Sequence, residues 1–384
     1  MKAAVLEEFG RPLCVREVRN PRIGSGEVLV DVLAAGVLPY TAEVFSGERR
    51  YPLEPPVIPG IGAVGRVVAT GPDATQLRPG ELVWCDPMVR SRDDALTPDV
   101  TLQGWSSAGT GGLALSRYFH DGSFAEQMVV PTENAVALGE VDLADVPRWS
   151  ALGLSLVPYG GLLAADLHAG ETVLISGATG NFGSAGVAVA LAMGAAMVVC
   201  PGRNETVLDD LKTRFGDRIR TVTLTSDEAA DRAAMHAAAR GPIDIVLDLL
   251  PPSAGTGPVR AAAMTVRPYG RVVLMGGVGM LGGGDLELPY PWLMRDSVTV
   301  RGQWMYPRTA NQRLINMIRS GVLDLRHESI TPFRLDQVNE AIAYAAAHGG
   351  PFDRTVLLPG TKTESPPPEP PHLCDAGSRR PHEQ

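Results

Sequence analysis

The chain has 384 residues, of which 45% are hydrophobic and 20% charged, and its formal net charge is −9. This length predicts two or three domains, and the composition is that of a globular protein with a sizeable buried core. The acidic balance argues against nucleic acid or an anionic membrane as the main partner. Gly (43) and Pro (32) are abundant but scattered, which excludes a collagen-like or disordered protein.

The four cysteines lie far apart and form no Cys-x-x-Cys pair, so the sequence predicts neither a disulfide framework nor a cysteine-built zinc knuckle. The N-terminal segment lacks the basic and then apolar pattern of a signal peptide. No window approaches the roughly 18 uninterrupted apolar residues that a membrane helix needs. We therefore expect a cytoplasmic protein with a small-molecule substrate and no membrane partner.

The first 150 residues contain short alternating or β-branched runs separated by Gly and Pro. Strands of this kind, joined by such turns, predict a compact antiparallel, barrel-like domain. The expected strands are 3–6, 27–32, 65–69, 81–85 and 125–130.

From residue 171 the pattern changes to apolar strands that alternate with helices, which indicates a doubly wound parallel sheet covered on both faces. The expected strands are 172–176, 196–200, 220–224, 243–249, 271–275 and 297–301, with helices that include 183–193, 227–239 and 258–264. Two helices, 311–319 and 335–347, and a strand, 354–358, follow. The tail, 360–384, contains ESPPPEPPH and is predicted to be disordered.

A glycine motif lies at the first strand-to-helix turn of this second region. Gly177, Gly180 and Gly183 form G-x-x-G-x-x-G directly after the strand and at the start of a helix. Glycine there permits a tight turn and close approach of a pyrophosphate, whose charge the helix N-terminus stabilises. The motif predicts a dinucleotide site, with a purely structural turn as the alternative.

The end of the second strand indicates which dinucleotide binds. An acidic residue there usually bonds the ribose 2′-hydroxyl of NAD, whereas NADP sites offer a cation to the 2′-phosphate. Here Gly202, Arg203 and Asn204 follow the strand, and the first carboxylate is Glu205. Arg203 can form paired charge-assisted bonds to a phosphate, so we expect NADPH. The alternative is that Arg203 only caps a loop.

Several stretches resemble one family. They are AAGVLPYTAEVFSG (34–47), PPVIPGIGAVGRVVATG (55–71), PGELVWCDP (79–87), DGSFAEQMVVP (121–131) and GATGNFGSAGV (177–187). Together with the domain order, they resemble the medium-chain dehydrogenase/reductase superfamily over about residues 1–360. The resemblance implies an α/β protein with a GroES-like, β-rich substrate domain (1–155) and a Rossmann NADP-binding domain (156–304). A C-terminal segment (305–359) then returns to the substrate domain, and hydride transfer takes place in the cleft.

The resemblance also implies that the catalytic zinc of the family's alcohol dehydrogenases is missing. Leu38, Ile61 and Gly62 stand where those enzymes carry cysteine and a His-Glu pair, and Ser155 aligns near the remaining cysteine. Leucine and isoleucine have no lone pair for zinc, and residues 86–120 contain no cysteine for a structural zinc. We therefore expect no metal and the zinc-independent, quinone oxidoreductase-like or enone reductase branch.

The resemblance implies a homodimer. Together with the glycine motif, it also defines the expected cofactor contacts. The expected NADPH contacts are Ser155, Gly177, Thr179, Gly180, Asn181, Phe182, Gly183, Gly202, Arg203, Asn204, Gly276 and Gly277.

Two tyrosines are candidates for the proton donor in a conjugate reduction. Tyr51, in GERRYPLEPP, aligns roughly with the tyrosine that the family's enoyl reductases use as an acid, and Tyr40 is the second candidate. The alternative for both is a wall that shapes the cleft. The expected function is NADPH-dependent reduction of an α,β-unsaturated carbonyl, a quinone or a related compound. The alternatives are an NADP-dependent alcohol dehydrogenase or ketone reductase, and an NADPH-binding protein without turnover.

Overall fold

The computed structural model describes residues 1–94 and 96–360. Apart from Gly360, the predicted disordered tail lies outside the described residues. Within these ranges, no helix is both long and apolar enough to cross a membrane.

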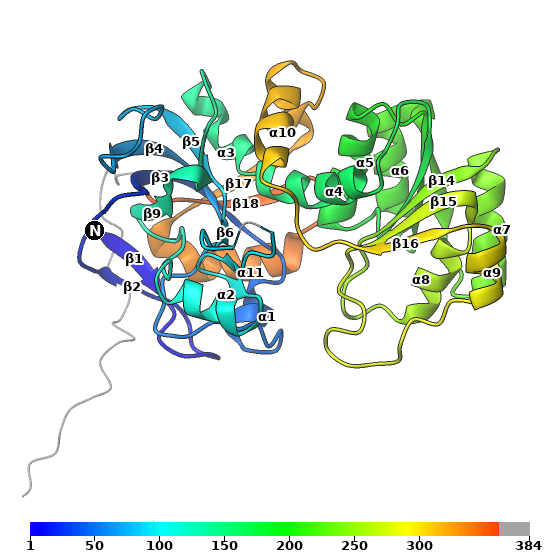
Figure 1. The fold of residues 1–384 in the computed structure, drawn as a ribbon, viewed down its shortest axis with the longest axis horizontal. Helices are drawn as coiled ribbons and strands as arrows, with labels where there is room; N and C mark the ends of the chain where they lie inside the picture. Colours follow the sequence, from blue (N-terminus) through cyan, green and yellow to red (C-terminus); the bar gives the residue numbers. More distant parts are fainter. Residues whose placement is uncertain (95, 361–384) are drawn as a thin grey trace, which may run out of the picture.

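A seven-stranded sheet forms the body on the left of Figure 1, with the order β10-β5-β4-β3-β18-β17 and β9 paired to β3. Only β17 and β18 pair in parallel; the other pairings in this sheet are antiparallel. The strands are β3 (Glu27–Val37), β4 (Ala63–Thr70), β5 (Leu82–Cys85), β9 (Gln127–Pro131), β10 (Ala135–Ala137), β17 (Ser329–Arg334) and β18 (Asp353–Leu358). Two strands from the C-terminal segment therefore complete the N-terminal sheet.

Two small sheets flank this body. One pairs β1 (Lys2–Val5) with β2 (Cys14–Glu17), and the other joins β6 (Met88–Arg90), β7 (Val100–Leu102) and β8 (Ser106–Ser107).

The second body is a six-stranded, wholly parallel sheet in the order β13-β12-β11-β14-β15-β16. Its strands are β11 (Thr172–Ser176), β12 (Met197–Gly202), β13 (Ile219–Thr223), β14 (Ile243–Asp248), β15 (Val266–Leu274) and β16 (Thr299–Gly302). The strand order reverses direction between β11 and β14, and ligands of such sheets bind outside the carboxyl ends at this point.

The α-helices cover the sheets and connect the two bodies (Figure 1). They are α1 (Thr41–Phe45), α2 (Gly109–Ser116), α3 (Val146–Trp149), α4 (Leu152–Ala164), α5 (Asn181–Ala192), α6 (Glu205–Phe215), α7 (Glu228–Ala239), α8 (Thr256–Ala263), α9 (Tyr290–Arg295), α10 (Thr309–Arg319) and α11 (Val338–His348). Single 3-10 turns occur at Thr132–Asn134, Leu143–Asp145, Gly216–Arg218, Leu325–His327 and Leu335–Gln337.

One hydrophobic core runs through both bodies. It includes Val30 in β3, Leu156 in α4, Val173 in β11 and Leu314 in α10, each fully buried. Helix α4 contacts both α5 and α10, so it joins the parallel sheet to the N-terminal body. The predicted α/β fold class, a β-rich domain with a parallel-sheet domain, is confirmed.

Several element boundaries differ from the sequence prediction. The strand expected at 27–32 continues to Val37, and the N-terminal domain is a mixed sheet that includes C-terminal strands rather than a purely antiparallel barrel. Helix α4 was not predicted, and it crosses the expected domain boundary between residues 155 and 156. Helix α2, with the sequence GTGGLALS, was also not predicted. The glycines in both helices, and Pro158 in α4, resemble turn signals.

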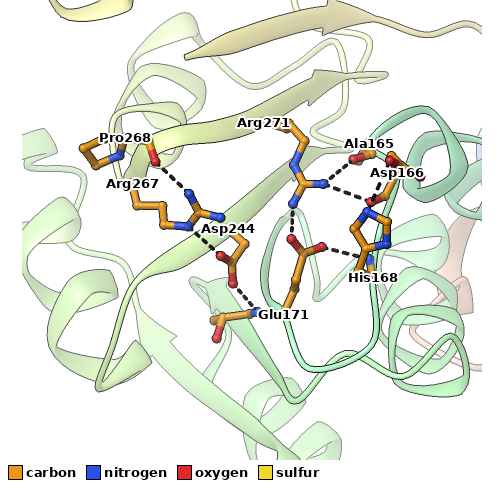
Figure 2. A network of polar contacts seen from close by, with 9 residues as sticks. Ala165, Asp166, His168, Glu171, Asp244, Arg267, Pro268 and Arg271 are labelled. Carbon is orange, nitrogen blue, oxygen red and sulfur yellow. Dashed lines mark hydrogen bonds and ion pairs between the residues drawn. The ribbon is translucent and has the colours of Figure 1, made fainter. Parts of the chain in front are cut away.

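A polar network fixes the amino-terminal edge of the parallel sheet (Figure 2). Arg271 of β15 bonds to Glu171 and to the carbonyl oxygens of Ala165 and Asp166, both at 2.9 Å. Glu171 also accepts the backbone N–H of His168 at 2.8 Å. This edge is opposite the glycine motif, so we assign the network a structural role.

Candidate active site

The glycine motif forms the turn between β11 and α5. Gly177 has φ of +86°, a left-handed conformation that L side chains rarely adopt. A side chain at Gly183 would collide with the Gly177 carbonyl, so α5 packs closely on the turn. The N-terminus of this 12-residue helix therefore opens at the carboxyl end of the sheet, where its free N–H groups can receive a phosphate.

The end of β12 lies against this turn. A side chain at Gly202 would collide with the Thr179 side chain, which shows how closely the two segments approach. Arg203 follows and is exposed. Within residues 1–94 and 96–360, no hydrogen bond or ion pair holds its guanidinium. Asn204 caps α6, since its side-chain oxygen accepts the Val207 N–H at 3.3 Å.

Gly276 and Gly277, after β15, lie at the same edge of the sheet. The Gly277 N–H donates to the Leu250 carbonyl at 2.8 Å, and a side chain at Gly276 would collide with the Asp248 carboxyl group. Asp248 ends β14 and is 3% exposed. Burial raises the pKa of its carboxyl group to about 7. Hydrogen bonds from Leu250, Ser176 and Gly276 lower this pKa, but by less than burial raises it.

Asn181 and Phe182, inside the glycine motif, contact the rest of the chain. The Asn181 side chain donates to the Gly350 carbonyl and accepts from Arg354, both at 2.8 Å. Arg354 is 4% exposed and forms an ion pair with Glu328 at 2.8 Å. Burial lowers the pKa of Arg354 and raises that of Glu328.

Sequence reasoning did not single out Arg354, a buried cation beside the glycine turn. Its Nη2 has no hydrogen-bond partner in the described part of the chain, and its Nε pairs with Glu328. An arginine at the start of the apolar terminal strand was the available signal, but only the fold brings it to Asn181.

The two candidate tyrosines lie near each other, and Tyr40 lies beside the glycine motif. The Tyr40 ring centroid is 6.5 Å from that of Phe182 and 6.0 Å from that of Trp105. The Arg49 guanidinium carbon lies 4.3 Å from the Tyr40 ring centroid, and its Nε donates to a Glu43 carboxylate oxygen at 2.7 Å. The structure therefore places Tyr40 where the N-terminal body meets the glycine turn, and Tyr51 lies near Tyr40.

Burial raises the pKa of both tyrosines above the ordinary value of 10.0. The positive charge of Arg49 acts in the opposite direction on both phenols. Both side chains are therefore protonated at neutral pH, as a proton donor must be.

The positions aligned with zinc ligands are apolar or buried. Leu38 and Ser155 are 8% and 3% exposed. A side-chain carbon at Gly62 would lie 2.8 Å from the Trp84 ring, and one at Gly153 would lie 3.0 Å from it, so these two segments meet at Trp84. Across the described residues, no three His, Cys, Asp or Glu side chains gather as a metal site requires. Leucine, isoleucine and glycine side chains have no donor atom, so this set does not fit a zinc ion.

The glycine turn of the parallel-sheet body thus lies beside Tyr40 of the N-terminal body. Residues 24–140 match the alcohol dehydrogenase GroES-like domain. An alcohol dehydrogenase from Rhizobium meliloti is 34% identical over 194 residues, which are 50% of this chain and 55% of that relative. The acryloyl-coenzyme A reductase of Metallosphaera sedula is 29% identical over 298 residues, covering 76% of this chain and 81% of the relative.

A solved structure has a similar fold over nearly the whole chain. A dehydrogenase from Sinorhizobium meliloti, described as zinc-binding and bound to NADP, has a TM-score of 0.76 at 22% identity, covering 93% of this chain and 99% of that one. Together the matches support the medium-chain dehydrogenase/reductase superfamily and an oxidoreductase of that type. The zinc-independent branch, the cofactor contacts and the substrate stay predictions.

Proposed function

We propose that this protein is a zinc-independent, NADPH-dependent reductase of α,β-unsaturated carbonyl compounds or quinones. The observation that carries the proposal is that Tyr40 lies against Phe182 of the glycine turn, with Tyr51 near Tyr40. The relative that reduces acryloyl-coenzyme A supports an activated C=C bond as the target.

NADPH supplies a hydride to the β-carbon of such a substrate when it is bound. The negative charge that develops on the substrate oxygen needs hydrogen-bond donors, and the α-carbon needs a proton. In this proposal Tyr51 holds that proton on its hydroxyl oxygen. The turn 177–183 binds the pyrophosphate, and the aromatic rings of Tyr40, Phe182 and Trp105 exclude water.

The preference for NADPH rests on the exposed Arg203 beside Gly202 and Thr179. The NADP-bound structural neighbour supports this choice. No carboxylate precedes Glu205 at the end of β12 to bond a free ribose hydroxyl.

Arg203→Ala is expected to weaken NADPH binding roughly ten- to a hundredfold and to leave NADH binding nearly unchanged, because it removes a charged pair to the 2′-phosphate. Fluorescence titration with both cofactors measures this. Arg19→Ala, at an exposed arginine of the N-terminal domain, is the matched control. Equal weakening of both cofactors would mean that Arg203 supports its loop and does not contact the phosphate.

The purified protein is expected to hold far less than one zinc atom per chain, because the aligned positions lack donor atoms. Elemental analysis measures the zinc, and activity is expected to survive chelators. One tightly held equivalent of zinc would contradict the proposal, whichever residues bind it.

A second candidate is an NADP-dependent alcohol dehydrogenase or ketone reductase, which the alcohol dehydrogenase relative favours. Without a Lewis acid, polarisation of an isolated ketone is weaker. A screen of NADPH oxidation over enones, quinones, enoyl thioesters and simple ketones separates the candidates. Turnover of simple ketones alone would favour the alcohol dehydrogenase or ketone reductase. If the protein turns over none of these compounds, an NADPH-binding protein without turnover is favoured.

A further inference from the structure

Aromatic and cationic neighbours contact the ring of Tyr40. Its centroid lies 6.0 Å from that of Trp105, with the ring planes at 67°, and 6.5 Å from that of Phe182 in the glycine turn. The Arg49 guanidinium carbon lies 4.3 Å from the same centroid. Aromatic rings at such separations attract each other, and so does a cation over a ring. These contacts favour one position of the Tyr40 ring.

Trp105 forms the layer behind Tyr40. Trp105 is 1% exposed, whereas Tyr40 and Phe182 are partly exposed. The indole also packs edge to face on Phe45, with the centroids 5.7 Å apart and the planes at 70°. Tyr40 is the N-cap residue of α1 and Phe45 is its last residue, so the indole contacts both ends of this helix. Because protein interiors are close-packed, it denies this space to the Tyr40 ring.

The backbone before Trp105 is fixed by a close crossing of two segments. Gly104 has φ of +68° and Gly60 has φ of +118°, conformations that L side chains rarely adopt. The Gly60 N–H donates to the Gly104 carbonyl at 3.2 Å. A side chain at Gly104 would collide with the backbone of Gly122. Contacts within the N-terminal body therefore set the position of the indole, independently of Tyr40.

We propose that Trp105 is a positioning residue that fixes the ring of Tyr40 against Phe182 and so limits the size of the substrate accepted there. The inference rests on the proposed function, in which the substrate binds beside Tyr40 and the glycine turn. In this inference Trp105 touches neither substrate nor cofactor, and it acts through Tyr40.

A shorter side chain at residue 105 would leave space behind Tyr40. The structure around such a cavity relaxes only in part. Tyr40 borders this space and is partly exposed, so its ring can turn into it and leave more room beside Phe182. In an apolar pocket, one methylene group changes the discrimination between substrates by roughly 10- to 200-fold. A displaced wall is therefore expected to change the preference between large and small substrates.

The kinetic test compares Trp105→Leu and Trp105→Phe with Trp149→Leu, a matched control at a buried tryptophan of α3. The quantity measured is the ratio of kcat/KM for a bulky enone, benzylideneacetone, to that for a small one, methyl vinyl ketone. We expect Trp105→Leu to raise this ratio about tenfold, Trp105→Phe to raise it by a smaller factor, and Trp149→Leu to leave it unchanged. Loss of folded enzyme lowers both values equally, so a purely structural defect does not move the ratio.

The position of the Tyr40 ring is measured without substrate, from crystal structures of Trp105→Leu and of the wild type. We expect the distance between the Tyr40 and Phe182 ring centroids, 6.5 Å in the wild type, to lengthen in the variant. Trp105→Phe takes the place of Trp105→Leu in both measurements if the leucine variant does not fold. An unmoved ring, an unchanged ratio, or an equal rise of the ratio in Trp149→Leu would overturn the proposal.

The two measurements separate this inference from the proposed function. A displaced ring with an unchanged ratio would show that Trp105 fixes Tyr40 without limiting the substrate, and the inference alone would fail. If the chain reduces simple ketones and no enone, the proposed function fails, and a bulky and a small ketone then test Trp105 in the same way.

Discussion

Tyr51→Phe is expected to lower turnover of a verified enone at least about tenfold while cofactor affinity and melting temperature stay near wild type. General acid catalysis contributes about 10²–10⁴-fold, and water replaces part of that contribution when the acid is lost. The substitution removes only the hydroxyl. Most of the ring's packing against the hydrophobic core therefore remains.

Steady-state kinetics and the solvent isotope effect measure the loss, with Tyr40→Phe in parallel. Tyr290→Phe, at a tyrosine of α9 that is 75% exposed, is the matched control. If Tyr51→Phe stays within about twofold of wild type while Tyr40→Phe abolishes turnover, the donor is Tyr40. If both variants stay fully active, the proton comes from water and the protein mainly positions the substrate.

The parallel-sheet domain could be predicted closely because its signals are local. The strand expected at 172–176 coincides with β11, and the helix expected at 227–239 differs from α7 only at Asp227, which caps the helix. Continuous apolar strands between polar helices specify such a sheet without knowledge of distant contacts.

Helix α4 could not be predicted because its glycines serve tertiary packing. A side chain at Gly160 would collide with the Met305 carbonyl, and one at Gly161 would collide with Met275. These glycines let α4 pack closely against segments more than 100 residues away in the sequence. In the sequence, the same residues resemble a loop.

The candidate site likewise has one part that a local sequence motif predicts and another part that depends on tertiary contacts. The turn at Gly177 and Gly183 follows from a local motif, whereas the contact of Asn181 with Arg354 joins residues 173 positions apart. Tyr51 and Arg49 are two residues apart in the sequence. Only the structure shows that Arg49 stacks on the ring of Tyr40 while Arg50 is exposed.

Asp248, at the carboxyl end of β14, is expected to make the free energy of unfolding depend strongly on pH. Its Oδ1 is buried and has no hydrogen-bond partner in the described part of the chain, so the charged form is poorly compensated. Burial raises the pKa of this carboxyl from 3.8 to about 7. Between about pH 4 and pH 7 the folded chain therefore keeps a proton that the unfolded chain has released.

Because the folded state binds more protons in this window, the contribution of Asp248 to the free energy of unfolding falls as the pH rises, and it levels off above pH 7. One pKa unit corresponds to about 1.4 kcal/mol, so the fall between pH 5 and pH 8 is roughly 2–3 kcal/mol. Asp248→Asn cannot ionise, and this component of the pH dependence is expected to disappear in the variant.

Urea unfolding of the cofactor-free chain at pH 5 and pH 8 measures the effect as a difference between variant and wild type, which cancels the other titrating groups. Relative to wild type, Asp248→Asn is expected to gain about 2–3 kcal/mol on going from pH 5 to pH 8. Asp209→Asn, at an exposed aspartate of α6, should show no such gain. An equal pH dependence in Asp248→Asn and wild type would mean that Asp248 is ionised in the folded protein at pH 5. The hydrogen bonds from Ser176, Leu250 and Gly276 would then outweigh its burial.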